Sequence, residues 1–233
     1  MTPSIVITGC QGLIGQALVR TLAPTAPIIA IDLHPPRSDL FPDLAVEQVQ
    51  LDVSRESEIQ SWAQGIKPGA LCGLINNAAI AYPYQPSLSE LPLEHWQKVL
   101  DVNLTGPMLM SKHLIPALAE GSGIVNIAST RAHQSEPNCE AYAASKGGLV
   151  ALTHALAISL GPKLRVNCIS PGWISDDPSL SDADHDQHPC GRVGRPEDVA
   201  HLAAFLLSQQ SGFVTAQNWT VDGGIGQRMR YEE

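Results

Sequence analysis

The composition is that of a folded protein with one substantial core and no basic surface. The chain has 233 residues, of which 44% are hydrophobic and 16% charged, which is typical of globular rather than disordered proteins. Its formal net charge of −9 argues against a nucleic-acid partner, because binding a phosphate backbone requires a basic face.

The sequence shows no sign of a secretory leader or a membrane segment. The first apolar run begins at Ile5, too early for a signal peptide, and no run reaches the roughly 18 consecutive apolar residues of a membrane span. Five scattered cysteines without C-x-x-C spacing favour free thiols in a reducing compartment. We therefore expect a soluble, cytoplasmic protein, without membrane partners, that forms one domain over residues 1–233.

Short apolar runs alternate with helical stretches along the chain. The runs are continuous, as expected of strands that are covered on both faces of a parallel sheet. They lie at residues 5–7, 28–31, 71–75, 124–128, 165–169 and 218–221. Helical periodicity covers residues 14–22, 56–63, 94–119, 140–160 and 196–207. This alternation predicts an α/β fold, a Rossmann-type doubly wound parallel sheet flanked by helices on both faces.

Two connecting segments differ from the rest. Residues 33–44 contain three prolines, so we expect no regular crossover helix there. Residues 175–190 are polar, acidic and rich in histidine, which predicts a mobile surface segment.

The first predicted strand leads through a glycine-rich turn into the first helix. Residues 8–15 read Thr-Gly-Cys-Gln-Gly-Leu-Ile-Gly, and glycines allow a backbone to turn tightly and approach a pyrophosphate. The helix N-terminus that follows offers unpaired N–H groups to the anion. A tight strand-to-helix turn without a ligand is the alternative, but strand, glycines and helix come in the order that a dinucleotide site requires.

Asp32 ends the second predicted strand, about 20 residues beyond this turn. A carboxylate at this position can accept both hydroxyl hydrogens of an adenosine ribose and would repel a 2′-phosphate. His34 and Arg37 lie nearby and could soften that repulsion. The sequence therefore favours NAD over NADP.

Tyr142 and Lys146 are four residues apart in a predicted helix and so share one face. A phenol with a pKa near ~10 is a poor base at neutral pH, but a neighbouring ammonium and an oxidised nicotinamide would favour the phenolate. A surface pair is the alternative if the motif stands alone. Ser129, at the end of the predicted strand 124–128, provides a second polar group for the same site.

Further motifs extend this pattern along the chain. In chain order they are Asn-Asn-Ala-Ala at 76–79, Asn103 within 102–104, Ser129, Tyr142 with Lys146, Arg-Val-Asn at 165–167, Pro171-Gly172, the segment 191–198 and Val-Asp-Gly-Gly at 221–224. From Thr8 almost to the C-terminus the chain resembles the short-chain dehydrogenase/reductases, in particular their single-domain branch.

The resemblance implies a role for each catalytic residue. Tyr142 would exchange a proton with the substrate oxygen, which Ser129 would orient by a hydrogen bond. Lys146 would hold the nicotinamide ribose and lower the pKa of Tyr142. Asn103 would hold a water that continues the proton relay to solvent. The implied cofactor-binding residues are Gly9, Gln11, Gly12, Leu13, Ile14, Asp32, Leu33, Asp52, Val53, Asn77, Ala78, Ala79, Tyr142, Lys146, Pro171, Gly172 and Ile174, and no metal is needed.

The sequence departs from the family pattern at several places. The glycine spacing T-G-x-x-G-x-x-G is more typical of the larger, two-domain members, which include epimerases and dehydratases, but the chain after Gly224 is too short for a substrate domain. Asp176 stands where relatives commonly have a threonine that helps bind the cofactor. The substrate loop, residues 173–190, is short, which favours a small or solvent-reaching substrate.

Two residues are candidates for contact with the substrate. Arg131 lies two residues beyond Ser129 and could bind a carboxylate or phosphate through bidentate hydrogen bonds. The alternative is an internal ion pair of Arg131 with Glu136 or Asp176. Trp173 could line the cleft or pack beneath it.

These residues predict an oxidoreductase that transfers a hydride between NAD(H) and a small secondary alcohol or ketone, for example a sugar, polyol or hydroxy acid. The alternatives are an NADP(H)-dependent 3-oxoacyl reductase, a non-redox epimerase or dehydratase, and an NAD-sensing module. A sensor would not need the three residues Ser129, Tyr142 and Lys146. Relatives pack their long helices against symmetry mates, so we expect a homodimer or homotetramer through residues 94–119 and 140–160.

Overall fold

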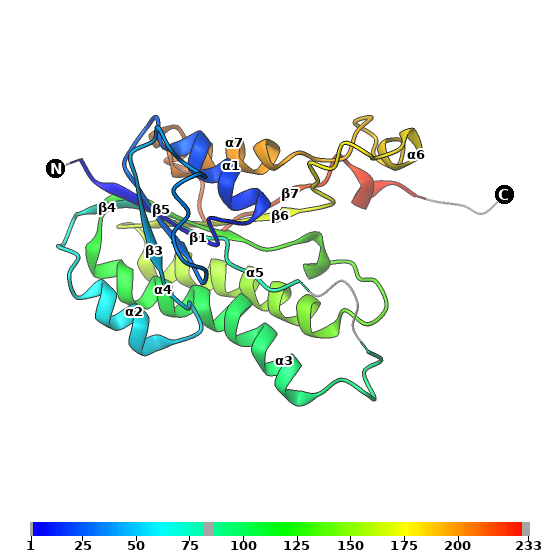
Figure 1. The fold of residues 1–233 in the computed structure, drawn as a ribbon, viewed down its shortest axis with the longest axis horizontal. Coiled ribbons are helices and arrows are strands. Elements are labelled where there is room, and N and C mark those ends of the chain that lie inside the picture. The colour runs from blue at the N-terminus through cyan, green and yellow to red at the C-terminus, as the bar shows by residue number, and fades with distance from the viewer. Residues whose placement is uncertain (1, 82–85, 230–233) are drawn as a thin grey trace.

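The computed structural model describes residues 2–81 and 86–229 and is built around one seven-stranded parallel sheet (Figure 1). The strands are β1 (Ser4–Thr8), β2 (Ile28–Asp32), β3 (Val46–Gln50), β4 (Leu71–Asn76), β5 (Leu118–Ile127), β6 (Arg165–Pro171) and β7 (Asn218–Val221). They lie in the order β3-β2-β1-β4-β5-β6-β7, and each neighbouring pair is parallel. The chain order therefore reverses between β1 and β4, where ligands of doubly wound sheets bind.

Helices cover both faces of the sheet, which confirms the predicted fold. Figure 1 shows α1 (Leu13–Leu22) and α7 (Pro196–Leu207) on one face, and α2 (Glu56–Ala63), α4 (Gly106–Leu114) and α5 (Glu140–Leu160) on the other. The remaining helices are α3 (Leu93–Leu100) and the short α6 (Asp182–His185). Short 3₁₀ turns are η2 (Ile115–Ala117), η3 (Thr130–Ala132), η4 (Gln209–Ser211) and η5 (Ile225–Gln227), and η1 (Asp101–Thr105) is a π-helical turn.

The central strands are buried on both faces, as their continuous apolar runs predict. Ile7 packs with Val19 of α1 and Leu206 of α7 on one side. Val6, the neighbour of Ile7, packs with Met110 of α4 on the other. Successive side chains of a strand point to opposite faces, so each buried strand contributes to two cores.

The structure corrects two features of the predicted elements. β3 was not expected, because its alternating sequence Val-Glu-Gln-Val-Gln belongs to a half-exposed edge strand. The long helix expected over residues 94–119 is interrupted by the π turn η1 and ends at Ala117. A proline explains the interruption, because Pro107, directly after η1, has no N–H to donate to the preceding turn. A second proline, Pro116, lies in η2, where the helical segment ends.

The segment expected to be a mobile surface loop is tied to the C-terminal part of the fold. It contains α6, whose first turn is closed by a capping box between Ser181 and Asp184. The Cys190 N–H donates to Gly223 O at 3.2 Å, and the Arg228 guanidinium donates to Asp186 O at 2.8 Å. The proline-rich segment 33–44 forms no helix, as expected.

Among the described residues, one helix, α5, is long and apolar enough to cross a membrane by length and composition alone. In this fold α5 packs against β6 and η3. Its Lys146 side chain is buried and donates to Ile127 O of β5. We therefore treat α5 as a covering helix of the sheet.

Candidate active site

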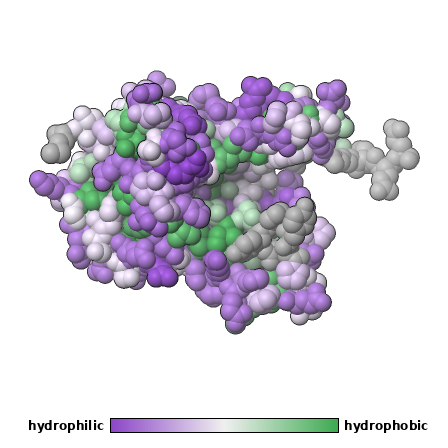
Figure 2. Space-filling view, viewed as in Figure 1, coloured by the Kyte–Doolittle hydropathy of each residue, from purple (hydrophilic) through white to green (hydrophobic). Residues whose placement is uncertain are grey.

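A cavity of about 1040 Å³ opens at the carboxyl ends of the strands, where the chain order reverses. In the space-filling view the surface is hollowed between the layer that carries α6 and the layer that carries α3 (Figure 2). The predicted cofactor residues that line the cavity are Gly9, Gly12, Leu13, Ile14, Asp32, Leu33, Asp52, Val53, Asn77, Ala78, Ala79 and Ile174. The predicted residues Gln11, Tyr142, Lys146, Pro171 and Gly172 are not part of this lining.

The glycine turn holds the first strand and helix unusually close together. Gly9 has a φ of +66°, and a Cβ there would lie 2.7 Å from Ala78 Cα. A Cβ on Gly15 would lie only 2.0 Å from Gly9 O, so α1 packs directly on the turn. Gly12 caps α1, whose first turn carries no acidic residue. The open N–H groups of this helix end therefore face the cavity with no acidic residue in their own turn, as a pyrophosphate requires.

Asp32 is held at the cavity edge by backbone donors. Its Oδ2 accepts the Gln11 N–H at 2.9 Å, and its Oδ1 accepts the His34 N–H at 3.1 Å. Each carboxylate oxygen has more than one acceptor position, so both remain able to accept a ribose hydroxyl. The Arg37 guanidinium is paired with Asp39 at 2.6 Å on the surface.

Gln11 does not line the cavity but contacts residues around it. Its backbone N–H fixes Asp32, and its side-chain amide donates to Pro35 O at 2.7 Å. Gln11 thus links the glycine turn to the segment after β2. Its predicted contact with the cofactor stays a prediction beside this positioning role.

Asn77 joins the two strands on either side of the cavity. Its side-chain amide donates to Thr8 O and Gly9 O, both at 3.0 Å. The Thr8 hydroxyl in turn accepts the backbone N–H groups of Asn77 and Ala78, both at 3.0 Å. The end of β4 therefore fixes the glycine turn at the end of β1.

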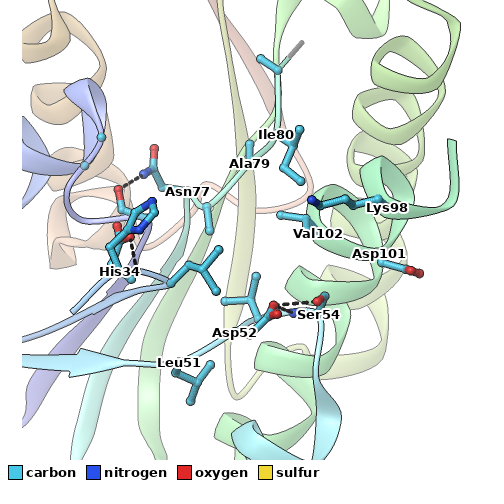
Figure 3. A pocket seen from close by; sticks show the side chains of 18 of the residues that line it. His34, Leu51, Asp52, Ser54, Asn77, Ala79, Ile80, Lys98, Asp101 and Val102 are labelled. Carbon is cyan, nitrogen blue, oxygen red and sulfur yellow. Dashed lines mark hydrogen bonds between the residues drawn. The ribbon is translucent and has the colours of Figure 1, made fainter. Parts of the chain in front are cut away.

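The opposite wall of the cavity was missed by the sequence analysis. Figure 3 shows Asn77 and His34 on one side and Ile80, Lys98 and Val102 facing them. This wall is formed by residues of α3 and η1, of which the sequence motifs indicated only the segment around Asn103. The residues that line the cavity there are Leu93, Glu94, Gln97, Lys98, Asp101 and Val102. The carboxylate of Asp52, one of the predicted cofactor-binding residues, accepts the Ser54 hydroxyl at 2.6 Å.

Tyr142 and Lys146 lie on one face of α5, as predicted. The Lys146 Nζ is 5.6 Å from the centre of the Tyr142 ring. It donates to Ile127 O at 2.8 Å and is almost fully buried. Burial lowers the pKa of Lys146 to about 8, because an ammonium is poorly stabilised away from water.

The electrostatics of Tyr142 differ from the expectation. Burial raises the pKa of the Tyr142 phenol, while its hydrogen bond with Ser129 and the positive charge of Arg131 act in the opposite direction. Arg131 is thus a cation acting on the phenol that the sequence did not indicate, and the effect of Lys146 on this pKa stays a prediction. The ammonium of Lys146 is directed at the Ile127 carbonyl instead.

Asn103 is fully buried in the π turn η1. Its Oδ1 accepts the Ile80 N–H at 2.7 Å, and its Nδ2 donates to Ile80 O at 2.9 Å and to Ser145 Oγ at 3.2 Å. Ser145 also donates to Tyr142 O at 2.7 Å. The amide therefore positions the chain after β4 against the start of α5, and its role in a proton relay stays a prediction.

Arg131 takes one of the two alternatives left open for it. Its guanidinium forms an ion pair with Glu136, and its backbone N–H donates to Ser129 Oγ at 3.1 Å. Asp176, the other predicted partner, lies in a separate hollow beside α1 and α7. Trp173 is 41% exposed, and its ring centre is 6.1 Å from that of His188.

The Pro171-Gly172 turn is supported by the C-terminal segment. The Gly172 N–H donates to Val221 O at 2.9 Å, and a Cβ on Gly172 would lie 2.7 Å from the Asp222 Cβ. Within the described part of the chain, no group of three or more His, Cys, Asp or Glu side chains could hold a metal ion.

Comparison with known proteins identifies the group of proteins that share this fold and site. A family model described as enoyl-(acyl carrier protein) reductase matches residues 14–226. The chain belongs to the short-chain dehydrogenase/reductase family. As a member, this short-chain dehydrogenase/reductase is an oxidoreductase that acts on CH–OH groups with an NAD(P) cofactor.

Three similar proteins show how far the resemblance extends. The dehydrogenase/reductase is 41% identical to an uncharacterized oxidoreductase of Thermotoga maritima, over 99% of this chain and 98% of that protein. It is 33% identical to cis-4-hydroxycyclohexanecarboxylate dehydrogenase of Sinomonas cyclohexanicum, over 94% of each chain. The ligand-free structure of Thermoplasma acidophilum aldohexose dehydrogenase superimposes with a TM-score of 0.87 at 27% identity, over 99% of this chain and 96% of that one.

Proposed function

We propose that this short-chain dehydrogenase/reductase transfers a hydride between NAD(H) and a small secondary alcohol or ketone, with Tyr142 as the acid/base group. The observation that carries the proposal is the convergence of Ser129, Tyr142 and Lys146 at one end of the sheet that also bears the glycine turn. Ser129 lies close enough to the phenol to lower its pKa, and Lys146 lies one turn along the same helix face. A fold used only to sense a dinucleotide has no need of this arrangement.

The choice of NAD rests on the surroundings of Asp32. The carboxylate is nearly buried and held by two backbone N–H groups, so it cannot easily turn away from a cofactor ribose. A 2′-phosphate would meet this negative charge in a poorly solvated place. The Arg37 guanidinium forms its ion pair with Asp39 rather than with Asp32.

The cavity fits a dinucleotide in its shape as well as in its donors. The missing Cβ atoms of Gly9 and Gly15 create the close approach of strand and helix on which a pyrophosphate rests. When bound, the nicotinamide supplies the group that accepts or releases the hydride. Asp32, the N-terminus of α1 and Asn77 would hold the cofactor, directly or by fixing the glycine turn.

The protein's own groups then handle the proton. Ser129 orients the substrate oxygen, and Tyr142 takes the hydroxyl proton during oxidation or returns it during reduction. The ammonium of Lys146 is positively charged below its pKa of about 8, which favours the phenolate of a neighbouring tyrosine. Arg131 adds a second positive charge near the phenol. Both cations work against the burial that otherwise keeps Tyr142 protonated.

The substrate expected here is small. The Sinomonas relative acts on a ring that carries a secondary alcohol and a carboxylate, and the Thermoplasma structure is of an enzyme for aldohexoses. We infer that secondary alcohols of this size, including hydroxy acids and sugars, are the class to test. We also infer that the chain forms a single domain. We infer a homodimer or homotetramer as well, because the apolar side chain of Ile158 on α5 is 79% exposed.

The proposal is tested by following NADH absorbance over a panel of secondary alcohols, hydroxy acids and sugars with NAD and with NADP. We expect reduction of NAD by at least one member, with kcat/KM at least about tenfold higher for NAD than for NADP. Conversion of a substrate to an isomer or a dehydrated product without net NADH would favour a non-redox activity. Tight NAD binding without turnover of any panel member would favour a sensor.

A further inference from the structure

The Arg131–Glu136 ion pair lies beside the catalytic groups, and the mechanism above uses only the charge of Arg131 and gives Glu136 no role. Arg131 lies in η3, two residues after Ser129, and its backbone N–H donates to the Ser129 hydroxyl oxygen. Its guanidinium carries a charge that the Tyr142 phenol experiences. The turn that begins at Ser129 therefore fixes Arg131 at the rim of the site where the substrate oxygen must lie.

The two members of the pair differ sharply in exposure. The Arg131 side chain is 28% exposed, whereas that of its partner Glu136 is 68% exposed. Glu136 belongs to the segment between η3 and α5, which also contains Asn138 with a φ of +62°. The arginine is thus held by the fold, while the glutamate reaches it from an exposed turn.

A guanidinium that is mostly buried, as in Arg131, needs a carboxylate or a similar planar acceptor to satisfy its N–H donors. In the structure Glu136 is the carboxylate that meets this need. An exposed ion pair contributes little to stability, so exchanging Glu136 for another carboxylate of the same geometry costs little. The pair has the properties of a binding site for an organic acid that is occupied by a side chain of the protein.

We propose that Arg131 binds the carboxylate of an anionic hydroxy acid or oxo acid, and that Glu136 occupies this subsite until the substrate displaces it. This inference rests on the proposed dehydrogenase function and names its substrate class. The closeness of Arg131 to Ser129 and Tyr142 requires the carboxylate and the reacting hydroxyl to be a few bonds apart, as in a small ring or a short chain. Exchange of one carboxylate for another also leaves the net charge beside Tyr142 unchanged.

Substitutions of Arg131 and of Glu136 are expected to have opposite effects on the binding of a carboxylate. This difference distinguishes the proposed subsite from an ion pair with a purely structural role. Arg131→Met removes the guanidinium and keeps an unbranched side chain of similar length. Glu136→Gln keeps the shape of the side chain that competes with the substrate for Arg131 and removes its negative charge. If the pair only braced the loop, both substitutions would weaken the site in the same direction.

The first measurement uses a non-reacting probe, cyclohexanecarboxylate, with its carboxamide as the neutral match. Both are tested as inhibitors against the best neutral alcohol of the substrate panel, with NAD saturating. We expect the carboxylate to inhibit the natural sequence at least about tenfold more tightly than the carboxamide, and Arg131→Met to abolish this preference. Glu136→Gln should tighten carboxylate inhibition by about two- to tenfold and leave carboxamide inhibition unchanged.

The pH profile gives a readout that loop bracing would not move. For the neutral alcohol, Glu136→Gln should shift the pH dependence of kcat/KM to lower pH, because Arg131 is then no longer neutralised beside Tyr142. Arg131→Met should shift it to higher pH. Arg192 forms an ion pair with Asp198 in another part of the chain, so Arg192→Met is the matched control. It should change neither the preference for carboxylate over carboxamide nor the pH profile of kcat/KM.

The proposal is overturned if Arg131→Met keeps the preference for carboxylate, or if both substitutions weaken carboxylate inhibition. Should no alcohol of the panel be oxidised, the proposed function fails on its own. The subsite is then measured with NAD bound, by the rise in melting temperature that cyclohexanecarboxylate causes and cyclohexanecarboxamide does not. Loss of that rise in Arg131→Met supports the subsite, and its persistence refutes it.

Discussion

Replacing Lys146 by methionine should abolish turnover and, at neutral pH, make the protein more stable. The ammonium is 2% exposed, and its burial lowers the pKa from the ordinary value of 10.5 to about 8. At about 1.4 kcal/mol per pKa unit, holding the charged form in this place costs roughly 3 kcal/mol of folding free energy. Methionine fills a similar volume without a charge.

Part of this gain is lost because the Ile127 carbonyl no longer receives the Lys146 ammonium. Leaving a buried acceptor without a donor costs about 1–3 kcal/mol. The net expectation at pH 7 is therefore a stabilisation of about 0–2 kcal/mol in Lys146→Met.

The pH dependence has a definite sign. Between pH 8 and 10.5 the unfolded chain keeps the lysine proton while the folded chain has released it, so the stability of the natural sequence rises with pH across this interval. The methionine variant lacks this rise, and its advantage should disappear as the pH approaches 10.5.

Urea unfolding at pH 7 and pH 9.5, followed by tryptophan fluorescence, measures both effects. Lys146→Arg keeps the charge and is the matched control, which should gain no stability. A Lys146→Met protein that is less stable than the natural sequence at pH 7, or a stability difference that does not change with pH, would refute the reasoning.

Two further substitutions test the cofactor site. Gly15→Ala places a Cβ 2.0 Å from Gly9 O and should cost about 2–4 kcal/mol in urea unfolding and eliminate NADH binding measured by fluorescence titration. Gly12→Ala, whose Cβ would have 3.5 Å to its nearest neighbour, should fold almost as stably, and equal losses in both variants would contradict the packing argument. Asp32→Ala should lower kcat/KM for NAD by about ten- to a hundredfold and so reduce the ratio of kcat/KM for NAD to that for NADP. Kinetic measurements with both cofactors give this ratio, and an unchanged ratio would show that Asp32 does not select the cofactor.

Much of the fold was predictable from local sequence, because the central strands are buried on both faces. β1 and β4 are continuous apolar runs for that reason, and the glycine turn follows β1 directly. β3 was missed because an edge strand with one exposed face has a polar, alternating sequence. The break at η1 depends on Pro107, whose effect is felt in the turn before it.

The candidate site divides in the same way. The spacing of Tyr142 and Lys146 within one helix is a local property, so their shared face could be predicted. The Asn103 contact with Ile80 spans 23 residues, and its contact with Ser145 spans 42. Such contacts depend on how α3, η1 and α5 pack, and no spacing in the sequence indicates them. The influence of Arg131 on the Tyr142 pKa was missed for a related reason, because it depends on how η3 packs against α5.

The claim on which the account depends is that the Tyr142 phenol moves the proton. Tyr142→Phe removes the hydroxyl and keeps the ring, so the stability and the Kd for NADH should change little, the latter by no more than about twofold. The decisive measurement is kcat for the best alcohol of the panel at saturating NAD. We expect it to fall by at least about a thousandfold in Tyr142→Phe. A variant that binds NADH normally and keeps a tenth or more of the original kcat would contradict the account, because the proton would then have another acceptor.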